Sequence, residues 1–409
     1  MKLESTFPSI KSLDLKKVIF AFPFFLIFIA NLFITRIHGF EYAGKLAIFA
    51  GISSSIALIY SMRWDAEILV KDEKNLSKSL SNGICVVIFL LIVSLSVNFL
   101  LKSYIPLLGF NSHLLFSASL IAFFELHINI FLKKNNLLSF IILRSLPPIL
   151  LVAFTLFNLT PELSWFLSYF LSLIPVLLSI YILHRKVWSF NFSVVNLLTS
   201  FKVMLPITLS ATIANSISII WLIVVANQLG SYEAGIWINA YRIASLPVAF
   251  CGAVIMPLVL VNIGSKSFYH EKFRVMFNFS YLILFAFFIT SFFLYTNGQV
   301  IFSFLTKNNL TISNFSLLII LLVTTMQYFM QYWKDLFQSV NKTFVILIIL
   351  SIELFLAFLI YFFSEVRTFD GLLHLIFIVT GFCFCLFLIY IFISYVRSKK
   401  IYSSESSKL

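Results

Sequence analysis

Residues 230–247 read GSYEAGIWINAYRIASLP, and the chain continues as VAFCGAVIMPLVLVNI over residues 248–263. This run is apolar enough to lie in a lipid bilayer, yet it contains Arg242. A guanidinium stays protonated in proteins, and a charge at the centre of a bilayer costs about 3 kcal/mol or more. Arg242 is therefore the first candidate for a functional residue in this sequence.

The composition of the whole chain places this run in a membrane protein. The chain has 409 residues, of which 61% are hydrophobic, 18% aromatic and only 11% charged. Its mean hydropathy is +1.02. A soluble domain cannot bury so much apolar surface, because its own surface must be largely polar. The sequence therefore predicts a polytopic membrane protein.

The apolar runs have the length of membrane-spanning helices. Strands of a membrane barrel would alternate polar and apolar residues over segments of about ten residues. Here the runs are continuous for about 18–25 residues, which a spanning helix needs. We predict an all-α protein with about twelve spans, at 18–35, 45–62, 83–101, 113–132, 139–158, 164–183, 203–227, 235–262, 276–296, 314–333, 344–363 and 371–394.

The positions of Lys and Arg predict the orientation. With the N-terminus placed in the cytoplasm, most of the 29 basic residues fall in cytoplasmic segments, Arg144 among them. Both termini are then predicted to be cytoplasmic. The net charge of +13 is spread over many loops and forms no single patch, so a nucleic-acid partner is not expected.

Catalytic and metal-binding patterns are missing from the sequence. The four cysteines (Cys85, Cys251, Cys383 and Cys385) all lie in predicted spans, and the six histidines follow no metal-ligand spacing. No glycine-rich nucleotide loop is present either. We therefore expect a protein that is not an enzyme and has no catalytic residue, metal site or cofactor.

A short pattern recurs at about half the length of the chain. Residues 39–44 read GFEYAG and residues 230–235 read GSYEAG, so both follow G-x-x-x-A-G. This repeat favours two six-helix halves, at residues 1–190 and 191–409, which begin on the same side of the membrane. Transporters are commonly built from such repeats, with the substrate site between the halves.

Two motifs carry a family resemblance. SMRWDAEILV (61–70) follows the second predicted span, and GSYEAGIWINAYRIASLP (230–247) covers the start of the eighth. Both stretches resemble motifs of Wzx-type O-antigen flippases, polysaccharide exporters of the multidrug/oligosaccharidyl-lipid/polysaccharide (MOP) superfamily. The number of spans and the chain length also resemble that family over nearly the whole protein, which implies a MATE-like fold.

The resemblance implies a function and partners. The protein would carry an undecaprenyl-pyrophosphate-linked oligosaccharide across the bacterial inner membrane, from the cytoplasmic to the periplasmic leaflet. Membrane lipid, the polysaccharide polymerase and the chain-length machinery would be its partners, with H⁺ or Na⁺ left open as the coupling ion. Two alternatives remain at this point: a cation-coupled multidrug exporter of the same fold, and an integral glycan polymerase.

Positive side chains are needed to hold a pyrophosphate, and arginine binds phosphate oxygens in a bidentate manner. The candidates for the pyrophosphate or the cavity are Arg242, Arg36 and Arg63. Gly230, Gly235 and Pro247 are expected to set the approach and bend of the helix that presents Arg242. Arg242 has a simpler interpretation as a side chain that extends to the membrane surface. For Arg63, together with Asp65 and Glu67, the simpler interpretation is a solvated cluster at the membrane boundary.

Two carboxylates within predicted spans are candidates for energy coupling or for lining the cavity, namely Glu125 and Glu353. Glu125 is the first candidate for a group that exchanges protons, because burial favours the neutral acid. It is equally well a structural acid paired with Asn129, which shares its helix face at i+4. A static ion pair between Arg242 and Glu353 is not favoured, because side chains on antiparallel helices lean in opposite directions.

Overall fold

The computed structural model describes residues 22–65, 68, 76–104, 112–134, 136–188, 194–245, 269–306, 312–339, 343–364, 366 and 368–406. Nearly all of these residues are helical, and none of them forms a strand. Ten helices in this part of the chain are long and apolar enough to cross a membrane. The predicted all-α, multi-pass membrane protein is confirmed, while the side on which the termini lie stays a prediction.

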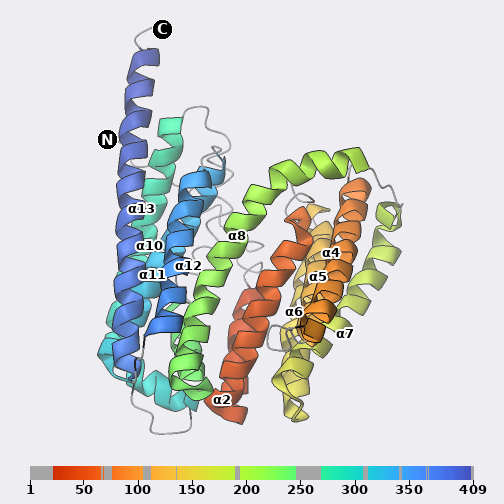
Figure 1. Cartoon of the computed structure of the whole chain (residues 1–409), viewed down its shortest axis with the longest axis horizontal. Coiled ribbons are helices and arrows are strands. Elements are labelled where there is room, and N and C mark those ends of the chain that lie inside the picture. Colours follow the sequence, from red (N-terminus) through yellow and green to blue (C-terminus); the bar gives the residue numbers. More distant parts are fainter. Residues whose placement is uncertain are drawn as a thin grey trace. The chain divides into compact units, whose positions relative to one another are not determined.

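The chain divides into two compact units, and the division falls between Ile219 and Ile220, inside a helix. The first unit is a bundle in which one helix is central: α5 contacts α2, α4, α6 and α7 (Figure 1). Its elements are α2 (Phe22–Ser61), α4 (Leu76–Tyr104), α5 (Ser112–Lys133), α6 (Leu137–Leu156), α7 (Pro161–Leu183), the 3₁₀ helix η5 (Arg185–Trp188) and the first part of α8 (Val194–Leu229).

The second unit begins within α8 and continues through a helix at residues 231–245. Its remaining elements are α10 (Tyr269–Thr306), α11 (Asn314–Ser339), α12 (Thr343–Phe363) and α13 (Phe369–Ser406), which run beside one another in Figure 1. Its interior is aromatic. Trp333 of α11 packs against Phe273 and Phe277 of α10, and its Nε1 donates a hydrogen bond to Ser280 Oγ at 2.9 Å.

Much of the phenylalanine in the sequence faces outward. On α10, Phe285, Phe288 and Phe292 are 63%, 67% and 74% exposed. Their spacing of three and four residues places them on one face of the helix. An apolar face this exposed would be unfavourable in water and is favourable in contact with lipid. The outward side chains therefore support the assignment to a membrane.

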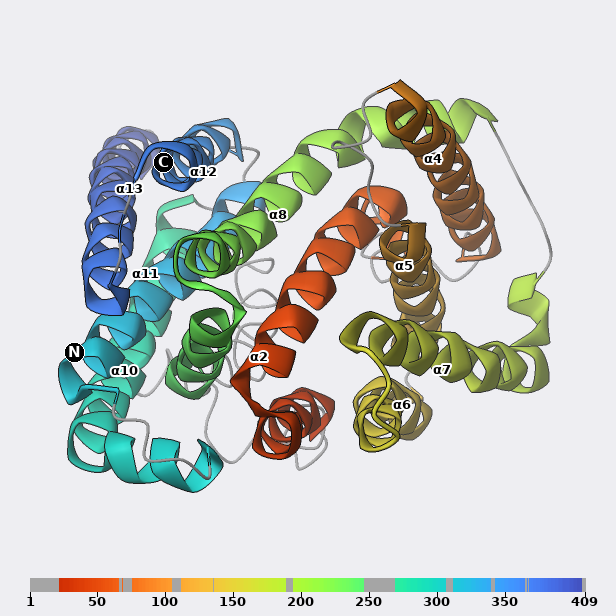
Figure 2. The same cartoon turned by 60° about the horizontal axis from the view of Figure 1, so that its bottom comes forward.

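The structure corrects the outer loop expected between the first two predicted spans. The described residues of these spans, at 22–35 and 45–61, belong to the single element α2, which continues across residues 36–44. The two parts of α2 join at Gly39, whose backbone (φ 82°, ψ 179°) is accessible to glycine and strained for other residues. Figure 2 shows that they run in different directions. One glycine thus replaces a loop.

The second copy of the repeat has a related turn. Gly230 lies between α8 and the 231–245 helix and also has a positive φ, of 108°. The alanines of the two motifs are buried, with Ala43 2% and Ala234 0% exposed. The G-x-x-x-A-G pattern therefore marks the same local arrangement twice, a glycine turn followed by a helix whose first turns pack inward. The boundary between the two six-helix halves, at residues 190/191, stays a prediction.

Candidate functional site

In the first unit, the central position of α5 brings a carboxylate into the bundle. Glu125 Oε2 accepts a hydrogen bond from Arg144 Nη1 of α6 at 2.8 Å. The Arg144 and Glu125 side chains are 19% and 28% exposed. A single charge in such a place would be costly, and an ion pair offsets much of that cost. Arg144, which the sequence analysis assigned to a cytoplasmic segment, lies within the candidate span Leu137–Leu156.

A strained turn after α2 brings a second arginine to the same region. Met62 and Arg63 both have left-handed backbones, with φ of 44° and 60°. Ser61 Oγ accepts a hydrogen bond from Arg63 N at 3.3 Å and donates one to Asp65 Oδ1 at 3.2 Å. Left-handed backbone is unfavourable for non-glycine residues and persists where surrounding contacts hold it. The Ser61 side chain supplies such contacts.

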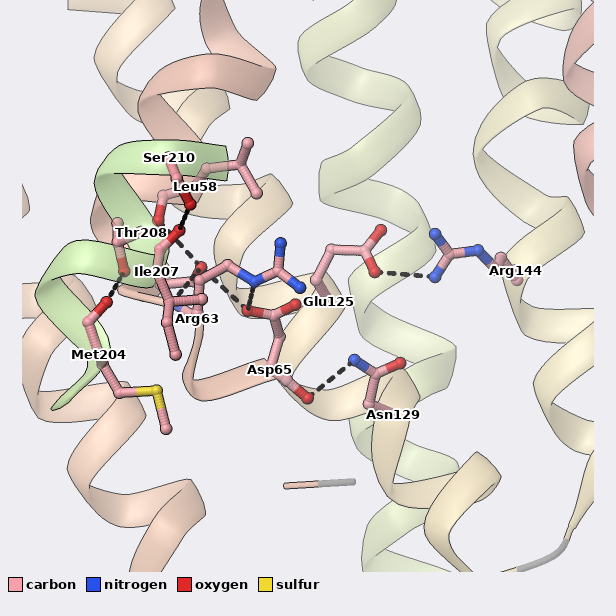
Figure 3. A network of polar contacts seen from close by, with 11 residues as sticks. Leu58, Arg63, Asp65, Glu125, Asn129, Arg144, Met204, Ile207, Thr208 and Ser210 are labelled. Atoms are coloured by element: carbon pink, nitrogen blue, oxygen red, sulfur yellow. Dashed lines mark hydrogen bonds and ion pairs between the residues drawn. The ribbon is translucent and has the colours of Figure 1, made fainter. Parts of the chain in front are cut away.

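The charges of this region alternate. Arg63 Nε lies 3.9 Å from Asp65 Oδ1, and the two side chains are 31% and 17% exposed. Figure 3 shows the Arg63 guanidinium pointing toward Glu125, with Arg144 on the other side of that carboxylate. We call these four residues (Arg63, Asp65, Glu125 and Arg144) the four-charge network. They are less exposed than the solvated boundary cluster expected for Arg63 and Asp65, and Glu67 lies outside the described residues.

Asn129 belongs to this network through the backbone. Its Nδ2 donates a hydrogen bond to the Asp65 carbonyl oxygen at 3.1 Å, so it ties α5 to the turn after α2. Within the described residues, Glu125 binds Arg144 and not Asn129. The contact expected from the i+4 spacing is therefore replaced by two contacts between helices, neither of which the spacing along α5 predicts.

The second unit holds a carboxylate of another kind. Glu353 on α12 is completely buried, and its Oε1 accepts a hydrogen bond from Thr380 Oγ1 of α13 at 3.0 Å. Within the described residues its Oε2 has no hydrogen-bond partner and the carboxyl forms no ion pair. An isolated ionised carboxylate in an apolar interior is very costly, and such groups take up a proton instead. Burial without a counter-charge therefore favours the neutral form of Glu353.

Polar side chains from two more helices surround Glu353. Trp221 of α8 and Gln327 of α11 lie beside its carboxyl group. Trp221 Nε1 and Gln327 Nε2 are buried and, in the described part of the chain, have no hydrogen-bond partner. Gln327 Oε1 accepts a hydrogen bond from Tyr241 Oη at 3.2 Å. We call these residues, with Thr380, the Glu353 cluster.

Arg242 follows Tyr241 on the 231–245 helix and is partly exposed. No carboxylate among the described residues forms an ion pair with it, in keeping with the expectation that it does not pair with Glu353. Gly230 forms the turn before this helix, and Gly235 is buried within its second turn. Pro247 lies outside the described residues, as does the rest of the predicted span beyond residue 245.

The structure brings together some of the predicted site residues and separates others. Arg63 and Glu125 belong to one network, whereas Glu353 and Arg242 lie in the second unit, on different helices. Arg36 is exposed on α2, three residues before the Gly39 turn. Sequence reasoning missed Arg144, Trp221, Gln327, Tyr241 and Thr380. The signal for Gln327 and Thr380 was a polar residue within an apolar run, TTMQYFMQYW and LIFIVTGFCF.

Comparisons with known proteins identify the fold. No protein-family pattern matches the sequence, and no curated protein matches it either. Solved structures do match along nearly the whole chain. The MATE multidrug transporter DinF-BH superposes with a TM-score of 0.67 at 16% identity, over 95% of this chain and 97% of that one.

Two further structures show multidrug resistance MATE transporters of the MOP superfamily. An inward-facing one has a TM-score of 0.63 at 13% identity and covers 95% of both chains. An outward-facing one has a TM-score of 0.52 at 15% identity, over 95% of this chain and 89% of the other. At these identities the likeness establishes the architecture alone, so the chain is a multi-pass membrane protein with the fold of MATE transporters of the MOP superfamily.

Proposed function

We propose that this protein is a flippase that moves an undecaprenyl-pyrophosphate-linked oligosaccharide from the cytoplasmic to the periplasmic leaflet of the bacterial inner membrane. It would work by alternating access, as a transporter fold permits. The halves predicted at residues 1–190 and 191–409 would be its moving parts. The motifs at residues 61–70 and 230–247 support the polysaccharide branch of the superfamily over the multidrug branch.

The observation that carries the proposal is Arg242. Arg144 and Arg63 have carboxylates beside them, whereas Arg242 has no ion-pair partner among the described residues. A cationic group without a carboxylate is free to bind an anionic ligand, and a pyrophosphate suits the bidentate geometry of a guanidinium. Arg36 and Arg63 are proposed as further contacts along the path of the pyrophosphate.

For energy coupling we favour Glu353 over Glu125. Glu125 forms an ion pair with Arg144, so its charge is already balanced within the first unit. Among the described residues Glu353 has no charged partner, and proton uptake relieves the cost of its burial. We therefore propose H⁺ and not Na⁺ as the coupling ion. The polar groups beside Glu353 that complete no hydrogen bond among the described residues, Trp221 Nε1 and Gln327 Nε2, are N–H donors, and donors do not coordinate a cation.

Complementation of a deletion strain tests the function. Lipid-linked repeat units should accumulate on the cytoplasmic side of the membrane when the gene is removed, and the wild-type gene should restore surface polysaccharide. Arg242→Ala should insert normally, because loss of an intramembrane charge favours insertion, and should not restore the polysaccharide. Arg242→Lys keeps the charge and loses the bidentate geometry, so weak restoration is expected.

Arg185→Ala is the matched control. Arg185 is exposed in η5, where its guanidinium packs 5.6 Å from the centre of the Tyr181 ring, outside the candidate spans. This variant should restore surface polysaccharide fully. Normal surface polysaccharide with normally expressed Arg242→Ala would contradict the proposed role and return Arg242 to a side chain that extends to the membrane surface.

The structural neighbours favour a second candidate, a cation-coupled multidrug exporter. Each of the neighbours described above is a multidrug transporter, and aromatic side chains suit organic cations. On this alternative, deletion should sensitise the cell to organic cations and leave surface polysaccharide unchanged. An unpaired arginine would repel such a substrate, which is why the flippase is preferred.

A further inference from the structure

In the described part of the chain, the hydrogen bonds of the Glu353 cluster are incomplete. Oε1 accepts a hydrogen bond from Thr380, whereas Oε2, Trp221 Nε1 and Gln327 Nε2 complete no hydrogen bond within the described residues, although Trp221 and Gln327 lie close enough to the carboxyl group to interact with it. All three atoms are buried. Unbonded polar atoms in a buried site are costly, so three of them in one place need an explanation.

A change of protonation accounts for all three atoms. The neutral acid carries its proton on one oxygen and makes little demand on neighbouring donors. After loss of that proton to water, the carboxylate accepts hydrogen bonds at both oxygens, and charge-assisted bonds are shorter and stronger than neutral ones. Trp221 and Gln327 supply the N–H groups that the ionised form of Glu353 requires.

Gln327 is bonded on its other side to the helix that carries Arg242. Its Oε1 accepts from Tyr241 Oη, and Tyr241 is the neighbour of Arg242 in the chain. An amide that donates to a carboxylate becomes polarised, and its carbonyl oxygen becomes a better acceptor. Ionisation of Glu353 therefore strengthens the bond from Tyr241 to Gln327.

We propose that Gln327 is a positioning residue, which transmits the proton occupancy of Glu353 on α12 to the 231–245 helix through Tyr241. The link itself stands on the contacts above. The role of this link in transport does rest on the proposed function: proton release by Glu353 would hold in place the helix that presents Arg242. The groups that face Glu353 from the neighbouring helices are Trp221 on α8, Gln327 on α11, and Thr380 with the titratable thiol of Cys383 on α13.

Hydrogen exchange measures this link without a substrate. The full-length protein in lipid nanodiscs is compared at about pH 6 and about pH 8, with exchange times corrected for the intrinsic effect of pH. Peptides that cover residues 231–245 should exchange about three- to tenfold more slowly at the higher pH, because a hydrogen bond to this helix is strengthened. Glu353→Gln should abolish the difference between the two pH values.

Tyr241→Phe should also abolish the difference, although Glu353 can still ionise in that variant. Tyr281→Phe is the matched control, since Tyr281 is 68% exposed on α10 of the same unit, and it should keep the full difference. If Tyr241→Phe does not fold, Gln327→Leu tests the same link. A pH difference that persists in either folded variant, or that is absent from the wild type, overturns the proposal.

Failure of the proposed function gives a different result. Arg242→Ala should keep the pH-dependent exchange, because Arg242 takes no part in the link. If that variant restores surface polysaccharide while the exchange difference of the wild type stands, the role of Arg242 is wrong and the link from Glu353 to the 231–245 helix remains.

Discussion

Glu125 and Glu353 are both carboxylates on membrane-spanning helices, yet their surroundings differ. Glu125 on α5 is 28% exposed and bonded to Arg144 at 2.8 Å. Glu353 on α12 is completely buried, and within the described residues it has a single hydrogen bond, from Thr380. The first unit thus places opposite charges beside one another, whereas the second surrounds one carboxyl group with neutral donors.

The difference separates structure from function. A charge balanced by its neighbours is stabilised in one form, and changing it damages the fold. A carboxyl group without a counter-charge can change its protonation state at little structural cost, which suits a coupling residue. The same contrast applies to the arginines, because Arg144 is paired with a carboxylate, whereas Arg242 has no carboxylate partner among the residues that the structure describes.

The largest effect is expected from breaking the ion pair of the first unit. Arg144→Met leaves Glu125 without its partner in a largely buried place, which should lower the free energy of unfolding by about 2–4 kcal/mol, allowing for partial exposure. Denaturant unfolding in detergent micelles measures it. The double variant Arg144→Met with Glu125→Met should recover most of the loss, and a double variant as unstable as Arg144→Met alone would contradict the pairing.

Neutralising each carboxylate in turn tests the comparison directly. Glu125→Gln removes a charge-assisted bond and leaves Arg144 uncompensated, so a loss of about 1–3 kcal/mol is expected. Glu353→Gln keeps the shape of a neutral acid and should change stability by about 0.5 kcal/mol or less. Thermal unfolding of both variants, at equal protein and detergent concentrations, gives the two values. Equal losses would show that Glu353 is ionised in this conformation.

The sequence predicted the architecture because the membrane imposes it. Spans must be long and apolar, so most of their positions follow from hydropathy. The turn at Gly39 was expected as a loop, because hydropathy does not distinguish a loop from a sharp turn at one residue. The recurrence of G-x-x-x-A-G was the better signal, since glycine is the residue that such backbones favour.

The site was predicted less well, because its contacts join different helices. Glu125 and Glu353 stand out as charges within apolar runs, and each faces a neighbouring helix of its own unit. Their partners do not follow from spacing: Arg144 was assigned to the cytoplasm because it lies near the start of a predicted span. Position along one helix gives the depth of a residue but not the side chain that faces it from the next helix.

Substitution of the glycine at each of the two turns, Gly39 in the first unit and Gly230 in the second, should lower stability by a smaller and similar amount. Gly39→Ala should cost about 1–2 kcal/mol of stability, because its positive φ disfavours a side chain although no atom lies within 4 Å of the added methyl group. Gly230→Ala, at φ 108°, should cost a similar amount. Gly381→Ala is the control: it lies within α13, also with nothing within 4 Å, and should stabilise by about 0.5–1 kcal/mol.

A stabilised Gly39→Ala variant, relative to the wild type in the same unfolding assay, would mean that residues 22–61 form a continuous helix without the turn. A difference between Gly39→Ala and Gly230→Ala larger than about 2 kcal/mol would show that the two copies of the motif are structurally distinct. Similar losses would support the internal repeat independently of the sequence pattern.

A further small effect concerns the hydrogen bond that Glu353 accepts from Thr380. Thr380→Val keeps the shape of the side chain and removes the hydroxyl that donates to Oε1 at 3.0 Å. If Glu353 is neutral, as its surroundings indicate, the bond is an ordinary one and its loss should cost about 0.5–1.5 kcal/mol. A bond to an ionised carboxylate would cost about 1.5–3 kcal/mol instead. Unfolding of Thr380→Val at about pH 6, in the wild-type and in the Glu353→Gln background, separates the two cases. The cost of Thr380→Val should be nearly the same in both backgrounds only if the carboxyl group of Glu353 is already protonated in the wild type.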